Sequence, residues 1–296
     1  MPNKVMVCAQ CPRKCGALRD ETHGEGHCRQ PSLPVVARAA LHRWEEPVIS
    51  GAHGAGTVFF SGCPLDCVFC QNDPISHRDF GKPISVERLT AIFQELEAQG
   101  ATTIDLVNPT HFAHVLPQAI AESGVKIPFV WNSGGYDSVE VIRALAPYIR
   151  VWLPDLKYLS PDRADQYSGA ADYPEVAKVA IREMVAHSGP AVVENGLLKQ
   201  GVLIRHLLLP GGLPEAKTVM DWVAETFPPG DVLFSLMGQY TPCGDLSAFP
   251  ELQRTVRPSE LRHAVEYMEA LGLPGFTQDA TSADAEYIPS FDLTGV

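Results

Sequence analysis

Residues 62–72 read Gly62-Cys63-Pro64-Leu65-Asp66-Cys67-Val68-Phe69-Cys70-Gln71-Asn72 and directly follow the strand-like run Thr57-Val58-Phe59-Phe60-Ser61. Their cysteines are spaced C-x3-C-x2-C. Three thiolates on one tight loop can bind three corners of a 4Fe–4S cube. Because such clusters normally take four thiolates, a site with three leaves one iron for another ligand. The loop therefore predicts a redox cofactor, with the aromatic ring before the last cysteine helping to shield it from water.

Two other interpretations of this triplet are a zinc knuckle and three unrelated core cysteines. Zinc requires a fourth ligand close by, and the loop offers none. Buried structural cysteines have no reason to recur at this spacing. The iron–sulfur interpretation is therefore the stronger one.

Length and composition exclude several classes of protein. The 296 residues, 45% of them hydrophobic, can bury a large core, and no run of about 20 apolar residues predicts a membrane span. The N-terminus is too polar for a secretory signal. Seven of the eight cysteines fall in two clusters, which is typical of metal chemistry in a reducing compartment. The formal charge of −12 argues against a nucleic-acid partner. We expect a cytoplasmic protein.

A second cysteine set lies in the first thirty residues, with the spacing C-x2-C-x3-C-x12-C. This glycine-rich piece has little apolar content of its own, so a metal is the most direct way to hold its shape. Structural zinc and an auxiliary iron–sulfur cluster both fit four thiolates, and His23 or His27 could replace one of them. A loose arm with reduced thiols is the alternative. The four cysteines are Cys8, Cys11, Cys15 and Cys28.

From Thr57 onward, strand-like and helix-like segments alternate. Six strands, each followed by a helix, predict parallel pairing with right-handed crossovers. Six units are too few for a closed eight-fold barrel, so we expect an α/β fold, a partial (β/α)6 TIM-type barrel, with a small N-terminal metal-binding segment. The expected parts are residues 1–50, the barrel at 51–275 and a tail at 276–296. The predicted strands are 57–61, 103–107, 127–131, 149–153, 202–209 and 232–237, and the predicted helices 84–100, 114–123, 137–145, 162–167, 174–186, 214–226 and 259–271.

Polar and glycine-rich segments follow the predicted strands, where α/β folds place their chemistry. Gly51, Gly54 and Gly56, in contrast, do not form a dinucleotide-binding fingerprint, because no helix opens after them. Cys243 stands alone and fits a packed or idle thiol better than a ligand or a radical relay. The segments after strands two to six are Asn108-Pro109-Thr110-His111, Asn132-Ser133-Gly134-Gly135-Tyr136, Pro154-Asp155-Leu156-Lys157-Tyr158, Pro210-Gly211-Gly212 and Gly238-Gln239-Tyr240.

Together with the cysteine loop, these segments resemble the radical S-adenosylmethionine (radical SAM) proteins related to pyruvate formate-lyase activating enzyme. The resemblance covers essentially the whole chain. Within this family, the chain resembles more specifically an activating-enzyme-like iron–sulfur branch, which also bears an N-terminal Cys-x2-Cys-Pro-Arg-x-Cys segment. The remaining matching segments are Cys11-Pro12-Arg13, Arg205-His206-Leu207-Leu208-Leu209-Pro210-Gly211 and Met237-Gly238-Gln239-Tyr240.

The resemblance implies a 4Fe–4S cluster held by Cys63, Cys67 and Cys70, with S-adenosylmethionine chelating the open iron. Lys157 would pair with the cofactor carboxylate, and Asp155 would help to position it. Two motifs depart from the activators: Asn108-Pro109-Thr110-His111 replaces Gly-Gly-Glu, and Asn132-Ser133-Gly134-Gly135 replaces an Asp-Thr-Asn-Gly-like sequence and loses an acidic group. The cofactor-binding residues expected on this basis are Asn108, Thr110, His111, Asn132, Ser133, Asp155, Lys157, Arg205, Met237 and Gln239.

The implied reaction is one-electron reduction of S-adenosylmethionine, which releases methionine and a 5′-deoxyadenosyl radical that abstracts hydrogen from a substrate. The leading substrate is the glycine Cα of a partner glycyl-radical enzyme, and a flavodoxin- or ferredoxin-type protein would donate the electron. Modification of a small molecule or peptide is the rival enzymatic function. A non-catalytic iron–sulfur carrier or scaffold ranks last, since it would need neither an open iron nor the polar strand ends.

Overall fold

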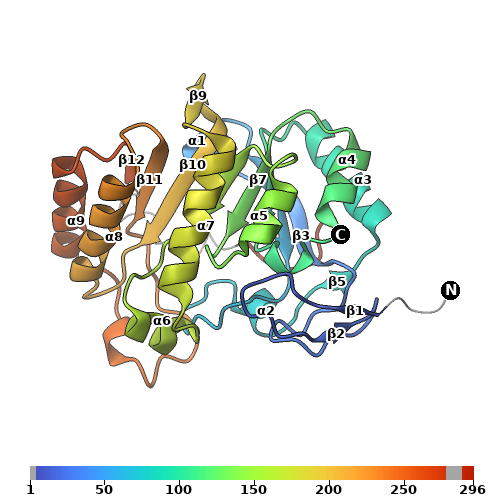
Figure 1. The fold of residues 1–296 in the computed structure, drawn as a ribbon, viewed down its shortest axis with the longest axis horizontal. Coiled ribbons are helices and arrows are strands. Elements are labelled where there is room, and N and C mark those ends of the chain that lie inside the picture. Colours follow the sequence, from blue (N-terminus) through green and yellow to red (C-terminus); the bar gives the residue numbers. More distant parts are fainter. Residues whose placement is uncertain (1–4, 278–288) are drawn as a thin grey trace.

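The body of the molecule is one large, mostly parallel sheet with helices packed along its outside (Figure 1). The computed structural model describes residues 5–277 and 289–296, whose strands form one ten-stranded and one two-stranded sheet. Six consecutive strands of the large sheet each run parallel to the next, which confirms the predicted strands and their pairing. They are β4 (Ala55–Phe60), β6 (Ile104–Val107), β7 (Phe129–Ser133), β8 (Val151–Pro154), β10 (Leu197–Leu207) and β11 (Val232–Met237).

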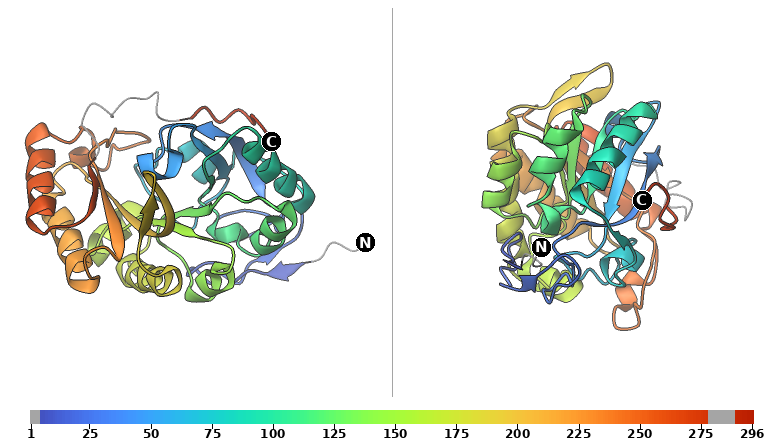
Figure 2. Two further views of the ribbon diagram at one scale, coloured as in Figure 1. Left: turned by 90° about the horizontal axis from the view of Figure 1, so that it is seen from above. Right: turned by 90° about the vertical axis from the view of Figure 1, so that its right-hand side faces the viewer.

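Helices connect these strands and cover the convex face of the curved sheet (Figure 2). The helix between β4 and β6 begins as predicted, because the Ser85 hydroxyl accepts a hydrogen bond from Arg88 N at 3.2 Å. Leu89, Ile92, Phe93 and Leu96 then share its buried face. The covering helices are α3 (Val86–Ala98), α4 (Leu116–Ser123), α5 (Val139–Leu145), α6 (Pro161–Ser168), α7 (Tyr173–Ser188), α8 (Leu213–Thr226) and α9 (Pro258–Ala270).

The sheet extends beyond the six predicted strands at both edges. β3 (Val35–His42), which precedes the predicted strands, pairs antiparallel with β4, and β5 (Lys82–Pro83) pairs with β3. At the far edge, β12 (Gly275–Thr277) runs parallel to β11, while β9 (Val192–Glu194) forms a hairpin with the start of β10. Within the described residues the two edges, β12 and β5, do not pair with one another. The predicted open partial barrel is therefore confirmed.

Side chains alternate between two cores, as strand geometry requires. On β7, for example, Phe129 and Trp131 join the core beneath the helices, whereas Val130 joins a second core on the concave face. The short helix α1 (Pro47–Ser50) contributes Val48 and Ile49 to this second core, which fills the barrel toward the N-terminal ends of the strands. The concave face becomes polar toward the opposite strand ends. The chemistry is therefore confined to one end of the barrel.

The N-terminal segment (residues 5–32) lies against that same end of the barrel, close to the short helix α2 (Asp73–Ser76) (Figure 1). It contains the small two-stranded sheet, β1 (Met6–Val7) with β2 (Leu18–Arg19). From the predicted tail, residues 289–296 return to β3, where Leu293 N donates to Ala37 O and Ala39 N donates to Thr294 O. Residues 278–288 of that tail lie outside the described residues. None of the described helices is long and apolar enough to cross a membrane.

Candidate functional site

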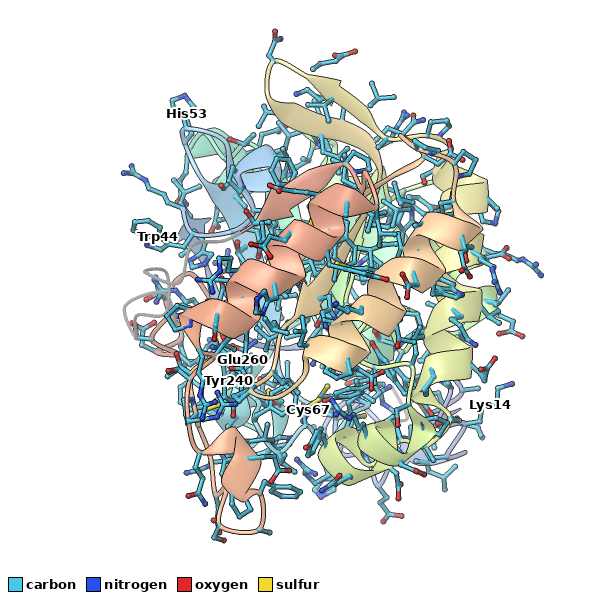
Figure 3. All side chains as sticks on the ribbon, turned by 90° about the vertical axis from the view of Figure 1, so that its left-hand side faces the viewer. Lys14, Trp44, His53, Cys67, Tyr240 and Glu260 are labelled. Carbon is cyan, nitrogen blue, oxygen red and sulfur yellow. The ribbon has the colours of Figure 1, made fainter. Side chains whose placement is uncertain are left out.

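The cluster loop, residues 62–72, connects β4 to α2 at the polar end of the barrel. It is fixed to the end of α6 by two backbone hydrogen bonds, from Asp66 N to Ser168 O (3.1 Å) and from Val68 N to Tyr167 O (2.9 Å). Figure 3 shows Cys67 at this end of the molecule, near Tyr240, whereas His53 lies at the opposite end. Phe69 packs edge-on against Tyr240, with 6.0 Å between ring centroids. Aromatic rings therefore cover one side of the loop.

The three cysteines of the cluster loop present thiols that are largely withdrawn from water. Burial raises the pKa of all three thiols, to about 12 at Cys70, and the nearby Cys67 raises the pKa of Cys63 and of Cys70 further. Two thiols have hydroxyl partners: Cys67 Sγ lies 3.1 Å from Ser168 Oγ, and Cys70 Sγ lies 3.1 Å from Ser76 Oγ. Since burial and mutual repulsion both disfavour three free thiolates, a bound cationic centre would stabilise them.

This donor set fits an iron–sulfur cluster. In the described part of the chain, no group of three or more His, Cys, Asp or Glu side chains is arranged to hold a metal ion. A four-iron cluster makes a different demand, because each thiolate binds its own iron. Three buried thiols on one loop, with charges that influence one another, supply three of its four ligands.

Lys157 links the cluster loop to the interior of the barrel. It follows the end of β8, and its Nζ lies 2.6 Å from Asp155 Oδ2, with both side chains less than one fifth exposed. Burial acts to lower the pKa of Lys157, but Asp155 and then Cys67 outweigh it, so its pKa is raised. Asp155 is also buried, yet Lys157 and Arg205 hold its pKa below the usual range. These two residues form a charged pair beside the cluster loop.

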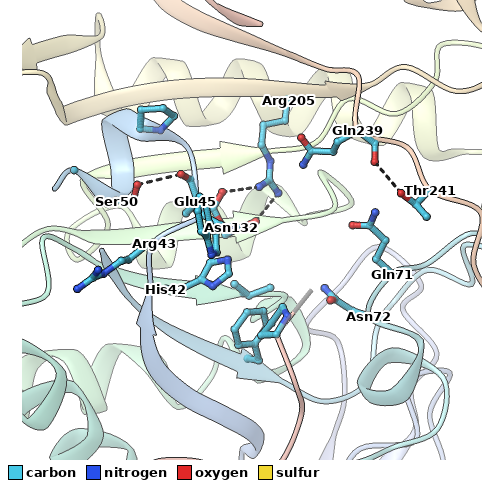
Figure 4. Close-up of a pocket in the computed structure, with 16 residues that line it drawn as sticks. His42, Arg43, Glu45, Ser50, Gln71, Asn72, Asn132, Arg205, Gln239 and Thr241 are labelled. Atoms are coloured by element: carbon cyan, nitrogen blue, oxygen red, sulfur yellow. Dashed lines mark hydrogen bonds and ion pairs between the residues drawn. The ribbon is translucent and has the colours of Figure 1, made fainter. Parts of the chain in front are cut away.

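Arg205 continues this network across the concave face (Figure 4). Its guanidinium donates from Nε to Asp155 Oδ1 (3.0 Å), from Nη2 to Asn132 Oδ1 (2.6 Å) and from Nη1 to Glu45 Oε1 (3.2 Å). Burial acts to lower the pKa of Arg205, and the carboxylates of Asp155 and Glu45 raise it by more. The guanidinium is therefore held in place from three sides.

Asn132 and Asp105 complete the network. Asn132 Nδ2 lies 3.2 Å from Asp105 Oδ2 and 3.2 Å from Glu45 Oε2. Asp105 is fully buried, and burial together with the neighbouring Glu45 raises its pKa well above the usual range. This environment favours the protonated form of the Asp105 carboxyl.

A cavity of about 490 Å³ opens beside this network. Figure 4 shows Glu45, Asn132 and Arg205 together on one wall, with Gln71 and Asn72 on another. Because the last two residues belong to the cluster loop, the cavity adjoins the predicted cluster. Its rim includes Trp44, which is 61% exposed. The polar residues lining the cavity are His42, Arg43, Trp44, Glu45, Ser50, Gln71, Asn72, Asn132, Arg205, Gln239 and Thr241.

The structure brings about half of the predicted cofactor-binding residues together here. Asn132, Arg205 and Gln239 line the cavity, and Asp155 and Lys157 connect it to the cluster loop.

The other predicted residues take different positions. Asn108 is next to the cluster loop, where its Nδ2 donates to Gly62 O and Cys63 Sγ lies 3.5 Å from its Oδ1. Thr110 and Ser133 both donate to the buried Asp137 and so join the strand ends. His111 is buried, and its Nε2 lies 2.6 Å from Ser61 O. Met237 ends β11 without being among the residues that line the cavity.

Sequence reasoning missed Glu45, Gln71, Asn72 and Thr241. Two of them, Gln71 and Asn72, directly follow Cys70, and this position was the available signal. Glu45 had no such signal, because it precedes the barrel in the chain. It enters the interior only because Pro47 starts α1 and the chain turns inward there.

The four N-terminal cysteines lie near one another. Cys8, Cys11 and Cys28 are buried, whereas Cys15 is exposed. Burial raises the pKa of Cys11 to about 12, with the other three thiols adding to the shift. Burial likewise raises the pKa of Cys28.

Comparison with known proteins places a cluster domain on this part of the fold. Residues 50–150 match the family model described as a 4Fe-4S single cluster domain. An uncharacterised protein of Methanocaldococcus jannaschii is 26% identical over 278 residues, which cover 90% of this chain and 75% of that protein.

Solved structures with a similar fold include SuiB of Streptococcus suis bound to its precursor peptide SuiA. The TM-score is 0.51 at 14% sequence identity, covering 74% of this chain and 47% of SuiB, so the chain spans about half the length of that protein. A domain of pyruvate-formate lyase-activating enzyme from Bacteroides vulgatus matches at 14% identity over 66% of this chain and 91% of that domain, but its TM-score of 0.39 is too low to support an inference. Residues 50–150 are therefore similar to a 4Fe–4S cluster domain, and the chain shares the fold of SuiB.

Proposed function

We propose that this protein is a radical SAM enzyme that cleaves S-adenosylmethionine reductively at a 4Fe–4S cluster held by Cys63, Cys67 and Cys70. One observation carries the proposal: three buried thiols on one loop adjoin a polar interior cavity through a single charged network. When bound, the reduced cluster supplies the electron that breaks the S–C5′ bond of the cofactor at the open iron.

The network offers both charges that a zwitterionic methionine group requires. Lys157 and Arg205 are buried cations that can receive a carboxylate, and Glu45 is a carboxylate that can receive an ammonium group. We assign Lys157 to the cofactor carboxylate because it is nearest the cluster loop. Glu45, which lies outside the strand-end motifs, supplies an acidic group. Two of those motifs lack the acidic residue that the activating enzymes have there. The side-chain amide of Asn132 bridges the two residues, because it donates to Glu45 and accepts from Arg205.

The cavity favours catalysis over the carrier or scaffold alternative. A protein that only moved electrons would have no use for a cavity of about 490 Å³ beside its cluster. Amide side chains on several elements, Gln71, Asn72 and Gln239, can donate and accept hydrogen bonds to an organic ligand. The strand ends thus supply binding and orientation, which are the protein's part in radical chemistry.

For the substrate we propose a glycine Cα in a polypeptide loop of a partner glycyl-radical enzyme. The open edge of the barrel and the exposed Trp44 and Arg43 at the cavity rim favour a macromolecular partner, since Trp and Arg are enriched where proteins bind one another. SuiB, which shares the fold, is described with a precursor peptide, and a peptide substrate is therefore the nearest alternative. The electron donor would be a flavodoxin- or ferredoxin-type protein.

Two spectroscopic steps test this function. In the first, S-adenosylmethionine is added to the anaerobically reconstituted, reduced protein; ligation at the open iron should change the electron paramagnetic resonance (EPR) spectrum of the cluster. An unchanged spectrum at saturating cofactor would contradict cofactor binding at the cluster.

In the second step, a glycyl-radical partner encoded in the same genome is added with reductant. A persistent glycyl signal should appear, and a partner with its radical glycine replaced by alanine is the control. Cofactor cleavage without any glycyl signal would move the assignment to a peptide or small molecule.

A further inference from the structure

The N-terminal segment has an unusual core. Its apolar side chains point outward: Val5, Val7 and Leu18 are 56%, 67% and 57% exposed. Its buried centre consists of thiols instead, with Cys8, Cys11 and Cys28 at 4–7% exposure. A segment that buries so little hydrocarbon cannot hold one conformation by the hydrophobic effect. A metal bound to the thiols supplies the missing stabilisation.

Arg19 shows that this core belongs to a fixed structure. Its guanidinium is 1% exposed and donates to Pro31 O (3.0 Å), to His111 O (2.6 Å) and to Cys8 Sγ (3.4 Å). It also stacks on Phe112, 5.3 Å from the ring centroid. These contacts fix Cys8 against the end of the barrel.

The N-terminal segment also grips the cluster loop. Arg13 Nε donates to Pro64 O at 2.8 Å, and its guanidinium lies 5.6 Å from the centroid of the Tyr136 ring. His27 Nε2 lies 3.1 Å from Asp66 Oδ2. These contacts reach the loop on both sides of Leu65, and so fix the peptide that separates Cys63 from Cys67.

A third contact is the closest. Gly62, immediately before Cys63, has a φ of +81°, and a Cβ there would lie 2.3 Å from Gln30 Cγ and 2.8 Å from Cys28 O. The backbone of the cluster loop and that of the N-terminal segment therefore touch between Cys28 and Cys63. One ligand of each cysteine set lies at this junction.

His111 joins the same arrangement from the barrel side. Its backbone oxygen accepts from Arg19, and its ring lies against Ser61 O, one residue before Gly62. His114 Nε2 lies 2.9 Å from Ser32 O. The motif after the second strand, expected at the cofactor, thus serves to dock the N-terminal segment.

We propose that Cys8, Cys11, Cys15 and Cys28 bind an iron–sulfur cluster, in which each thiolate binds its own iron, and that this cluster holds the N-terminal segment as a clamp that positions the cluster loop. Loss of the metal would loosen Arg13, His27 and the Gly62 junction together. This proposal rests on the proposed function in one respect, that the cluster loop holds a cluster. Its test does not require enzymatic turnover.

The test compares the parent with Cys11→Ser/Cys28→Ser, both reconstituted anaerobically. Iron, sulfide and zinc are counted first: the double variant should lose iron together with sulfide, and a loss of zinc alone would overturn the second cluster. The cluster at Cys63, Cys67 and Cys70 should survive, with a shifted EPR spectrum in its reduced form and several-fold faster loss of iron in air. Val7→Ser, next to Cys8 in the chain but facing solvent, should behave as the parent.

A second variant, Arg13→Met, distinguishes loss of the clamp from general misfolding of the double variant. It keeps all four N-terminal cysteines and removes one grip on the cluster loop, so it should retain the metal and still shift the EPR spectrum of the reduced cluster. Metal contents that are equal in the parent and the double variant would overturn the metal centre. An unchanged spectrum and air stability after metal loss and in Arg13→Met would overturn the clamp. Formation of 5′-deoxyadenosine by the parent is scored separately, so failure of the proposed function cannot be confused with either result.

Discussion

Lys157 carries a largely buried ammonium group that pairs with Asp155 of the interior network and lies close enough to Cys67 of the cluster loop to feel its charge. Burial opposes its charge, but Asp155, 2.6 Å away, and Cys67 more than compensate, so Lys157 stays protonated. Its position after a strand and beside Asp155 made it a candidate from sequence. Its proximity to Cys67 could not be predicted, because this depends on how the cluster loop folds back over α6.

Replacing Lys157 with alanine should weaken S-adenosylmethionine binding and leave the cluster in place. The loss of one buried charge-assisted contact is expected to cost about 1.5–3 kcal/mol, roughly ten- to a hundredfold in Kd. Titration of the cofactor against the EPR signal of the reduced cluster measures this. Lys126→Ala, at an exposed lysine, is the control. Equal affinity in the two variants would remove Lys157 from the cofactor site.

Asp105 should make the stability of the protein depend on pH. Burial, with the neighbouring Glu45, raises its pKa well above the ordinary value of 3.8, so the native state holds a proton that the unfolded chain releases. The stability contributed by this group therefore falls as pH rises from about 4 toward the native pKa. Asp105→Asn cannot release a proton, so its stability advantage over the parent should grow with pH.

Urea unfolding of the reconstituted protein at about pH 5.5 and about pH 8 measures this difference. Asp245→Asn is the control, because hydrogen bonds from Ser247 lower the pKa of this exposed carboxyl instead. If the free energies of unfolding of Asp105→Asn and of the parent differ by the same amount at both pH values, Asp105 is ionised in the native state.

The cluster loop owes its conformation to elements far from it in the chain. Strands and helices of the barrel were predictable because local periodicity and caps such as Ser85 define them. β12, β5 and the entry of Glu45 were not, since they depend on long-range packing at the sheet edges. The contact of residues 5–32 with the cluster loop could not be predicted for the same reason. The three cysteines were visible in the sequence, but the parts that hold them in place were not.

Gly62 tests this dependence on a distant element. Gly62→Ala should lower the iron and sulfide bound at the cluster loop, because the added methyl group would collide with Gln30 and the Cys28 carbonyl. Gly100→Ala is matched to it, with a φ of +87° but no atom within 4 Å of the new methyl group. This control should lose only the roughly 1–2 kcal/mol of stability that the backbone strain costs, and it should keep its iron. Equal iron and sulfide contents in the two variants would mean that the junction does not shape the loop.

The whole molecule places one charged end of an open barrel against a cysteine-rich N-terminal segment. The concave face is apolar toward one end, closed by α1, and polar toward the other, where the cluster loop, Lys157 and the cavity meet. Sequence reasoning reached the barrel, its open form and the cluster cysteines. It distributed the cofactor residues over all strand ends, whereas the cavity gathers only those whose side chains face the concave side, such as Asn132 and Arg205. Whether a strand-end side chain faces inward depends on register, which the motifs do not specify.

Reductive cleavage of S-adenosylmethionine tests the central claim most directly. The measurement is 5′-deoxyadenosine formed by the anaerobically reconstituted protein with a chemical reductant, compared with the variant in which Cys63, Cys67 and Cys70 are all alanine. The parent should form 5′-deoxyadenosine, and the variant should lose one 4Fe–4S cluster and form none, because each cysteine is a ligand of that cluster. Cleavage by the triple variant, or no cleavage by a parent carrying its full complement of iron and sulfide, would contradict the account.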